Sequence, residues 1–179
     1  MPYDALHDDA DALLGFWRPP DQRQARLRTE FVRFLSEHAD ALERPNPHGH
    51  LTASAIVVNA ERTHVLLTLH PKIGRWLQLG GHIEAGDATV AGAALREATE
   101  ESGIVGLWVR PDPIDLDIHA LDCPKGTPNR HLDVRFLTVA PPGATHSISD
   151  ESDDLRWFAF DELPVGSDDS VRRLVERIR

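Results

Sequence analysis

The sequence predicts an α/β fold in which a mixed sheet lies between helices and is preceded by a helical extension. Three observations predict it. Apolar residues recur at helical spacing through residues 3–42, short aliphatic or β-branched runs separated by turns begin at Leu51, and helical patterns return at 88–102 and 171–178. Because most of the strand-like runs follow one another as hairpins do, the sheet is expected to be mixed.

Two helices are expected before the sheet. The second begins after Asp21, which suits an N-cap, and is expected to run to the break at Pro45 and Pro47. The chain is therefore divided into a helical extension, residues 1–47, and a domain with a C-terminal helix, residues 48–179. The first helix is expected to end before Pro19, and its apolar positions are Tyr3, Leu6, Ala10, Leu13, Leu14 and Trp17.

The remaining elements follow from local patterns. Residues 55–59 and 64–69 are expected to form a hairpin around a polar turn, and Gly103 stands where a glycine would end the helix at 88–102. Residues 167–170 offer a cap for a closing helix with one apolar face. Further strands are expected at 104–109, 114–121, 132–140 and 155–160.

Composition narrows the function. The chain has 19 Lys and Arg against 29 Asp and Glu, a net charge of -10, which disfavours nucleic-acid binding. An anionic ligand would then need a bound divalent cation to neutralise it. The single cysteine, Cys123, allows no intrachain disulfide and no cysteine-based zinc site. With no run of about 20 apolar residues and no apolar signal segment at the start, a cytoplasmic protein is expected and a membrane partner is not.

The segment 80–104 holds five carboxylates and one basic side chain, Arg96. At about 100° per residue, Glu97, Glu100 and Glu101 share one helix face. Like charges at i,i+4 cost about 0.2–0.5 kcal/mol per pair, so an uncompensated cluster predicts a cation, although a solvated helix face is the alternative. Oxygen donors suit Mg²⁺ or Mn²⁺ rather than zinc, and such an ion activates water for attack on phosphorus.

This segment resembles the Nudix box of the Nudix hydrolase superfamily, written G-x5-E-x7-R-E-U-x-E-E-x-G-U with U a bulky aliphatic residue. Residues 96–104, REATEESGI, match its second half, and Gly81 matches its first glycine. Two departures stand out: the acid six positions after Gly81 is Asp87 instead of Glu, and eight residues rather than seven separate it from Arg96. We expect the extra residue to be absorbed where the loop meets the helix, with Asp87 as N-cap.

The resemblance implies a Nudix-type α/β/α sandwich over about residues 51–164, and hydrolysis of a diphosphate bond in a nucleoside diphosphate derivative with Mg²⁺ or Mn²⁺. It implies metal ligation by the residues matching Glu97, Glu100 and Glu101 and by the carbonyl of Gly80, with Arg96 orienting the glutamates. The stretch ISDESDDLRWFAFDELP resembles the segment near the family's C-terminal strand and makes Glu151 a candidate ligand or base, a plain polar loop being the alternative. Dimers are common in the family, so a homodimer is an open analogy.

Two other stretches are candidates for substrate contact. His131, Asp133 and Arg135 alternate on one face of an expected strand, as they would in a pocket or on an ordinary solvent-facing strand. Lys72 and Arg75 precede the box and could meet a diphosphate, or could form a basic turn without a function. His82 is expected to be a loop residue rather than a zinc ligand, because the histidines lack HExxH or paired spacing.

Two alternatives to hydrolysis remain. A Nudix-fold module that binds a nucleotide or a protein without cleaving it would typically have lost box acids, and these are retained in this chain. Isomerase chemistry would need an acid partner for Cys123, and the Pro/Gly-rich loop around it shows none. The choice of substrate within the family depends on loops outside the box and is left open.

Overall fold

The structure is a computed structural model that describes residues 2–121, 129–148 and 152–179. Two helices come first, and the strands follow in two groups that are separated by one helix and closed by another, which is an α/β fold as expected. The elements are α1 (Asp4–Phe16), α2 (Gln22–Glu37), β1 (His50–Val58), β2 (His64–His70), β3 (Arg75–Leu77), β4 (Leu79–His82), α3 (Val90–Ser102), β5 (Trp108–Val109), β6 (Asp115–Leu121), β7 (Asn129–Val139), β8 (Asp154–Ala159) and α4 (Asp169–Ile178).

The sheet is built around β1 and β7, which pair in parallel along the whole length of β1, from His50–His131 to Val58–Val139. The first half of β1 also pairs antiparallel with β4, and its last residues pair with β2. β3 and β8 pair antiparallel with β2, and β5 and β6 pair antiparallel with β7. The mixed sheet predicted from the sequence is confirmed.

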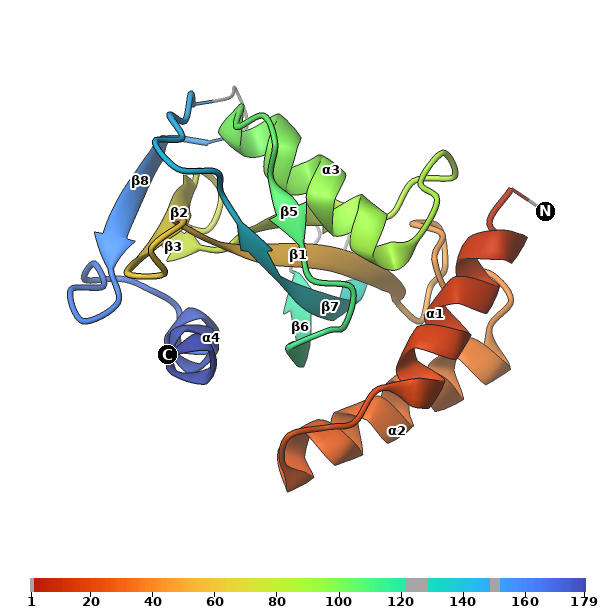
Figure 1. The fold of residues 1–179 in the computed structure, drawn as a ribbon. Coiled ribbons are helices and arrows are strands. Elements are labelled where there is room, and N and C mark those ends of the chain that lie inside the picture. Colours follow the sequence, from red (N-terminus) through yellow and green to blue (C-terminus); the bar gives the residue numbers. More distant parts are fainter. Residues whose placement is uncertain (1, 122–128, 149–151) are drawn as a thin grey trace.

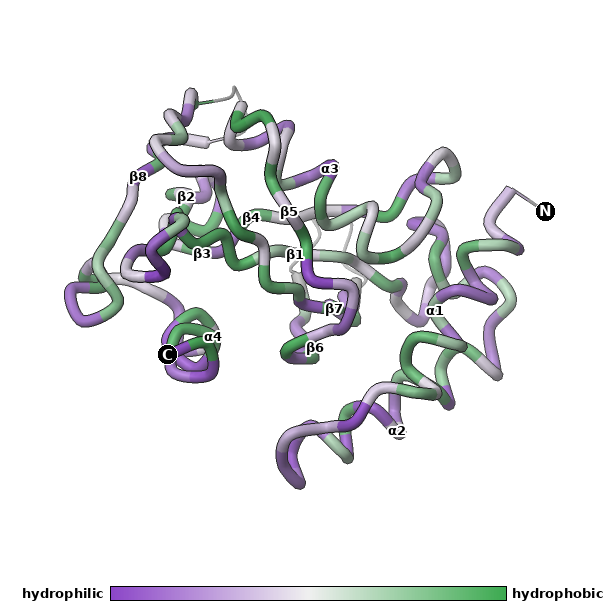
Figure 2. Tube along the Cα trace, viewed as in Figure 1, coloured by the Kyte–Doolittle hydropathy of each residue, from purple (hydrophilic) through white to green (hydrophobic). Residues whose placement is uncertain are grey.

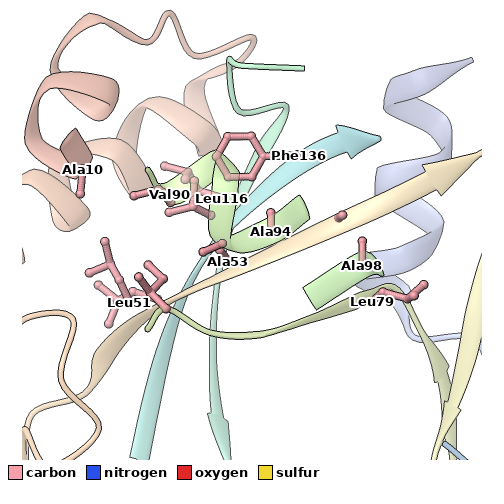
Figure 3. Close-up of a cluster of buried hydrophobic side chains, with 14 of the residues drawn as sticks. Ala10, Leu51, Ala53, Leu79, Val90, Ala94, Ala98, Leu116 and Phe136 are labelled. Atoms are coloured by element: carbon pink, nitrogen blue, oxygen red, sulfur yellow. The ribbon is translucent and has the colours of Figure 1, made fainter. Parts of the chain in front are cut away.

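Helices cover both faces of the sheet (Figure 1). α3 packs on one face through Ala94 and Ala98, which belong to the same core cluster as Ala53, Leu79 and Phe136, and in Figure 3 Ala98 lies beside Leu79. α4 covers the other face through Val171, Leu174 and Val175, and in Figure 2 its hydrophobic side faces the sheet. The arrangement is the α/β/α sandwich expected from the sequence, and α3 is held where β1 and β4 run side by side.

The N-terminal helices pack into the same core as the sheet. Leu14 of α1 and Phe31 of α2 are fully buried and belong to the cluster that contains Leu51 and Ala94. α1 also touches the start of α3, because the Asp9 carboxylate accepts a hydrogen bond of 2.7 Å from the backbone N–H of Val90. Within the described residues no helix is long and apolar enough to cross a membrane.

Several local predictions are confirmed. Asp21 caps α2, since its carboxylate accepts a 2.8 Å hydrogen bond from the Gln24 N–H. Gly103 ends α3 in the left-handed conformation, φ 66°. Asp168, within the predicted cap segment, caps α4. Short-range patterns were sufficient for these features because each depends on neighbours in the chain.

Other local predictions are wrong. α2 ends at Glu37, and the expected extension toward Pro45 is a series of turns in which the Asn46 side chain bonds Asp40 and His48. The apolar residues after Glu37 continue the helical spacing by coincidence, because Leu42 is buried in the core although it lies in a turn. The strand expected at 104–109 is reduced to β5, since only Trp108 and Val109 pair with β7. The short strands β3 and β4 were not predicted.

Candidate active site

The acidic helix α3 begins at a threonine cap. The Thr89 side chain accepts a 2.9 Å hydrogen bond from the Gly92 N–H, and Val90, Ala93 and Ala98 turn into the core. The prediction that Asp87 is the N-cap is therefore wrong. The small alanines allow α3 to approach β1 and β4 closely, which brings its acidic side to the end of β4.

A glycine pair in β4 receives the buried acids of α3. Gly80 has φ +150°, and a β-carbon there would lie 2.5 Å from Ser54 Cα, so only glycine fits. Its N–H donates to Glu101 Oε1 at 3.2 Å. A β-carbon on Gly81 would lie 2.7 Å from the carboxyl carbon of Glu97. The β4 backbone therefore lies directly against both carboxylates.

Arg96 donates hydrogen bonds to three of the acids and to a backbone carbonyl, and all of its guanidinium nitrogens take part. Nη1 donates to Glu97 Oε1 and to Glu100 Oε2, each at 3.0 Å. Nη2 donates to the His82 carbonyl at 2.9 Å and to Asp87, and Nε donates to Asp87 at 2.9 Å. The hydrogen bond to Asp87, with the charge of Glu97, raises the pKa of Arg96, so this cation is permanent.

Asp87 shows how the additional residue in the box is accommodated. Its carboxylate holds Arg96 at both oxygens and also accepts a 2.8 Å hydrogen bond from the Glu84 N–H. The loop from Glu84 to Thr89 thus closes on itself before α3 starts, and the shorter acid still reaches the arginine. The expectation that the helix itself stays regular is confirmed, because α3 runs unbroken from Val90 to Ser102.

The three glutamates of α3 differ in exposure. Glu101 is 8% exposed and the Glu97 side chain 12%, whereas the Glu100 side chain is 60% exposed. Within the described part of the chain, the three carboxylates do not come as close as 4.8 Å to one another as a set. Glu97 and Glu101 form the inner part of the site, and Glu100 lies at its rim beside Arg96.

The comparisons with known proteins agree with this geometry. The family model of the NUDIX domain matches residues 48–177. The chain belongs to the Nudix family. Family membership makes it a Nudix-type pyrophosphohydrolase, as the sequence predicted.

Solved Nudix structures share the fold of this chain. A NUDIX-family hydrolase from Clostridium perfringens is 24% identical, with a TM-score of 0.60 over 72% of this chain and 95% of that one. A MutT NUDIX hydrolase from Burkholderia pseudomallei is also 24% identical, with a TM-score of 0.55 over 72% and 97%. An Ap4A hydrolase from C. elegans is 19% identical, with a TM-score of 0.54 over 71% and 93%. A comparison with curated protein sequences gives no match.

The predicted substrate residues of β7 lie on the sheet face away from α3, and they are buried rather than solvent-facing. Arg135 is 2% exposed and forms ion pairs with Asp133 at 2.8 Å, Asp117 at 3.1 Å and Asp115 at 3.7 Å. Burial works against the charge of Arg135, but its three aspartate partners raise its pKa. In this Nudix protein the Arg135 guanidinium thus donates hydrogen bonds to Asp133 and Asp117, whereas its Nη1 lies near Asp115 without a hydrogen bond.

Helices from both ends of the chain close this acidic cluster. From α2, Gln24 donates to Asp115 at 2.6 Å and Arg23 to Asp117 at 2.8 Å. Arg177 of α4 lies 3.3 Å from Asp115. Burial raises the pKa of Asp115 to about 6, whereas in Asp117 hydrogen bonds and nearby cations overcome burial and lower the pKa to about 2.

The remaining predicted residues lie apart from the acids of α3. Lys72 is exposed in the turn between β2 and β3, and Arg75 is 58% exposed with its guanidinium 3.0 Å from the Asp168 carboxylate. Glu151, the candidate ligand or base, and Cys123 lie outside the described residues.

Sequence reasoning missed a cluster of histidines. His82 is not a loop residue, as predicted, but the last residue of β4, where it lies beside His50 of β1 and His131 of β7. These residues are far apart in the sequence and follow no metal-binding spacing. The only available signal was that His50 and His131 each stand directly before a strand-like run, and nothing placed His82 in a strand, because β4 was not predicted.

Proposed function

We propose that this chain hydrolyses a diphosphate bond in a nucleoside diphosphate derivative, using Mg²⁺ or Mn²⁺ bound at the β4–α3 junction. The observation that carries the proposal is the placement of Glu97 and Glu101 against the glycine pair of β4, with Arg96 held by Asp87. Buried carboxylates are costly unless they are paired or coordinate a metal. At this junction Arg96 donates hydrogen bonds to Asp87, Glu97 and Glu100, and Glu101 accepts one from the Gly80 N–H.

The donor set fits a hard divalent cation. Glu97 and Glu101, with Glu100 at the rim and the Gly80 carbonyl, would supply oxygen ligands only, which suits Mg²⁺ or Mn²⁺. When bound, such an ion lowers the pKa of a water molecule and neutralises charge that develops on the phosphoryl oxygens. Arg96 would keep Glu97 and Glu100 oriented, and its own donors are engaged by Asp87 and the His82 carbonyl.

Nucleotides are the substrate class that we propose. Net charge of -10 favours small anionic substrates that arrive with a metal ion over a polyanion such as RNA. The similar structures include a protein named as an Ap4A hydrolase, a name that fits a diphosphate-containing nucleotide. Lys72, exposed beside β3, and Arg75 remain proposed substrate contacts, and Arg75 would have to exchange Asp168 for phosphate.

The test is hydrolysis of a panel of nucleotide diphosphate derivatives by purified protein with Mg²⁺ or Mn²⁺, followed as released phosphate products. Glu101→Gln keeps an oxygen that can accept from the Gly80 N–H, but removes the negative charge. We expect a loss of turnover of about 100-fold or more, since a metal ligand supplies several kcal/mol to the transition state. Glu84→Gln, an exposed acid in the adjoining loop, is the matched control and should retain activity. Equal turnover by Glu101→Gln and wild type would refute the proposed site.

A further inference from the structure

Three histidines from three neighbouring strands converge at one end of the sheet. The ring centroids of His50 and His131 are 4.7 Å apart, those of His50 and His82 5.0 Å, and those of His82 and His131 5.3 Å. One ring nitrogen from each lies within 4.8 Å of the other two. Within the described residues, this is the one group of histidine, cysteine and acidic side chains that meets so closely.

Strand register builds the cluster. His50 and His131 are direct partners in the parallel β1–β7 ladder, and Thr52, two residues after His50, is the partner of His82 in the β1–β4 ladder. Residues two apart in a strand point to the same face, so all three rings project away from α3. The backbone of three paired strands therefore fixes the positions of the rings.

The environment favours neutral imidazole. His50 is completely buried and His131 is 8% exposed. Burial works against a charged imidazolium, and charges on rings this close together would repel one another. Neutral imidazole is the form that binds a metal.

Nitrogen donors also select the type of ion. Imidazole ligands suit zinc and similar transition metals, whereas Mg²⁺ prefers oxygen. At a tetrahedral zinc the ligand nitrogens are about 3.4 Å apart, given Zn–N bonds of about 2.0–2.1 Å. The observed separations are at most 4.8 Å, so the ring nitrogens would have to move closer together when an ion binds.

We propose that His50, His82 and His131 form a binding site for one zinc-class divalent ion, separate from the carboxylate site of α3. The fourth position is open to water or to His119 of β6, whose ring centroid is 5.4 Å from that of His131. His119 is the direct partner of His131 in the β6–β7 ladder, and its Nδ1 lies 3.8 Å from an Asp117 carboxylate oxygen.

A metal ion at this site would stabilise the backbone at the end of β4, next to the carboxylates of α3. An ion bound there ties the end of β4 to β1 and β7. The same strand carries Gly80 and Gly81, and the His82 carbonyl accepts a hydrogen bond from Arg96. The ion therefore stabilises the backbone against which Glu97 and Glu101 are placed, and has a structural role that does not require the hydrolase chemistry.

The test is Zn²⁺ binding to the metal-free full chain by calorimetry, in excess Mg²⁺ to occupy oxygen sites, with Co²⁺ absorption to detect nitrogen ligands. We expect one Zn²⁺ per chain and a rise in melting temperature. His82→Asn and His131→Asn should each weaken binding by about 100-fold or more, beyond the 10- to 100-fold loss typical of outer-shell partners. Both variants keep a polar side chain, and circular dichroism without metal verifies that they fold.

Two control variants separate this site from other sources of zinc binding. His64→Asn alters a partly exposed histidine of β2, whose ring meets Thr63 rather than the cluster, and should leave the affinity unchanged. Glu100→Gln alters the carboxylate site and should also leave it unchanged. The proposal is overturned if wild type binds no Zn²⁺, or if folded His82→Asn and His131→Asn bind it as tightly as wild type.

Discussion

The Glu97 carboxylate lies directly against the α-carbon of Gly81, so closely that a methyl group on Gly81 would be 2.7 Å from its carboxyl carbon. Because the obstructing atoms are the end of a flexible side chain, Gly81→Ala should displace Glu97 and leave the fold intact. We expect hydrolysis to fall about tenfold or more while the melting temperature changes little. Steady-state kinetics alongside thermal unfolding would check both parts.

The neighbouring glycine provides the contrast. A β-carbon on Gly80 would meet backbone, 2.5 Å from Ser54 Cα and 2.8 Å from the Ala53 carbonyl oxygen, at a φ that disfavours side chains. Gly80→Ala should therefore destabilise the whole protein, by about 2 kcal/mol or more. If Gly81→Ala were the less stable of the two, the assignment of Gly81 to the site and Gly80 to the fold would be wrong.

Asp87 should contribute stability as well as order. Its side chain is 6% exposed and holds Arg96 by two hydrogen bonds. Asp87→Ala removes charge-assisted hydrogen bonds and should lower the free energy of unfolding by about 2 kcal/mol, with a loss of activity as Arg96 becomes mobile. Urea denaturation measures the first effect. Glu84→Gln in the same loop should change neither the free energy of unfolding nor the activity. Asp87→Glu would show whether a longer acid can still bind Arg96 in a loop that has one residue more than the family pattern.

The N-terminal helix α1 should stabilise the start of α3 through the hydrogen bond between Asp9 and Val90. The Asp9 carboxylate accepts the N–H of Val90, the first residue of α3. Asp9→Ala removes a cap-like interaction and should lower the free energy of unfolding by about 1 kcal/mol, whereas Asp9→Asn should retain most of this stability. Asp8→Ala and Asp11→Ala, both exposed on the same helix, serve as controls in chemical denaturation. An Asp9→Ala variant with an unchanged free energy of unfolding would show that the start of α3 does not depend on this hydrogen bond.

Asp168 should make stability depend on acid pH. Burial opposes its ionisation, but the N–H of Ser170 and the guanidinium of Arg75 more than compensate and lower its pKa below the ordinary 3.8. A depressed folded-state pKa gives stability that is present above the unfolded value and is lost as pH falls through the folded value. The advantage of wild type over Asp168→Asn should thus be constant near neutral pH, and should be lost as pH falls from the unfolded value of 3.8 through the lower folded-state pKa.

Urea denaturation from about pH 3 to pH 7 measures this difference. Asp161→Asn, on the exposed turn after β8, is the control for a general charge effect. A wild-type advantage that grows as pH falls would contradict the lowered pKa of Asp168.

The acid helix was accessible to sequence analysis because its determinants are local. The spacing of Glu97, Glu100 and Glu101 follows from helical periodicity, and Gly103 ends the helix through its own backbone preference. Asp87 marks the limit of what the sequence predicts. Its position in the box follows from the sequence, but the sequence does not distinguish an N-cap from a residue that pairs with an arginine. Its hydrogen bonds to Arg96 join the loop to the helix, and neither helical nor strand periodicity predicts which side chains meet there.

Sequence alone thus determined the α/β architecture, the β1–β2 hairpin, the caps at Asp21 and Gly103 and the acidic face of α3, since each depends on residues within a few positions of one another. Tertiary structure alone decided that His50, His82 and His131 meet and that Arg135 is enclosed by three aspartates. Those contacts depend on strand register and on helices packed from both ends of the chain. Alternation shows which residues of a strand share a face, but not which strand lies beside it or what covers that face.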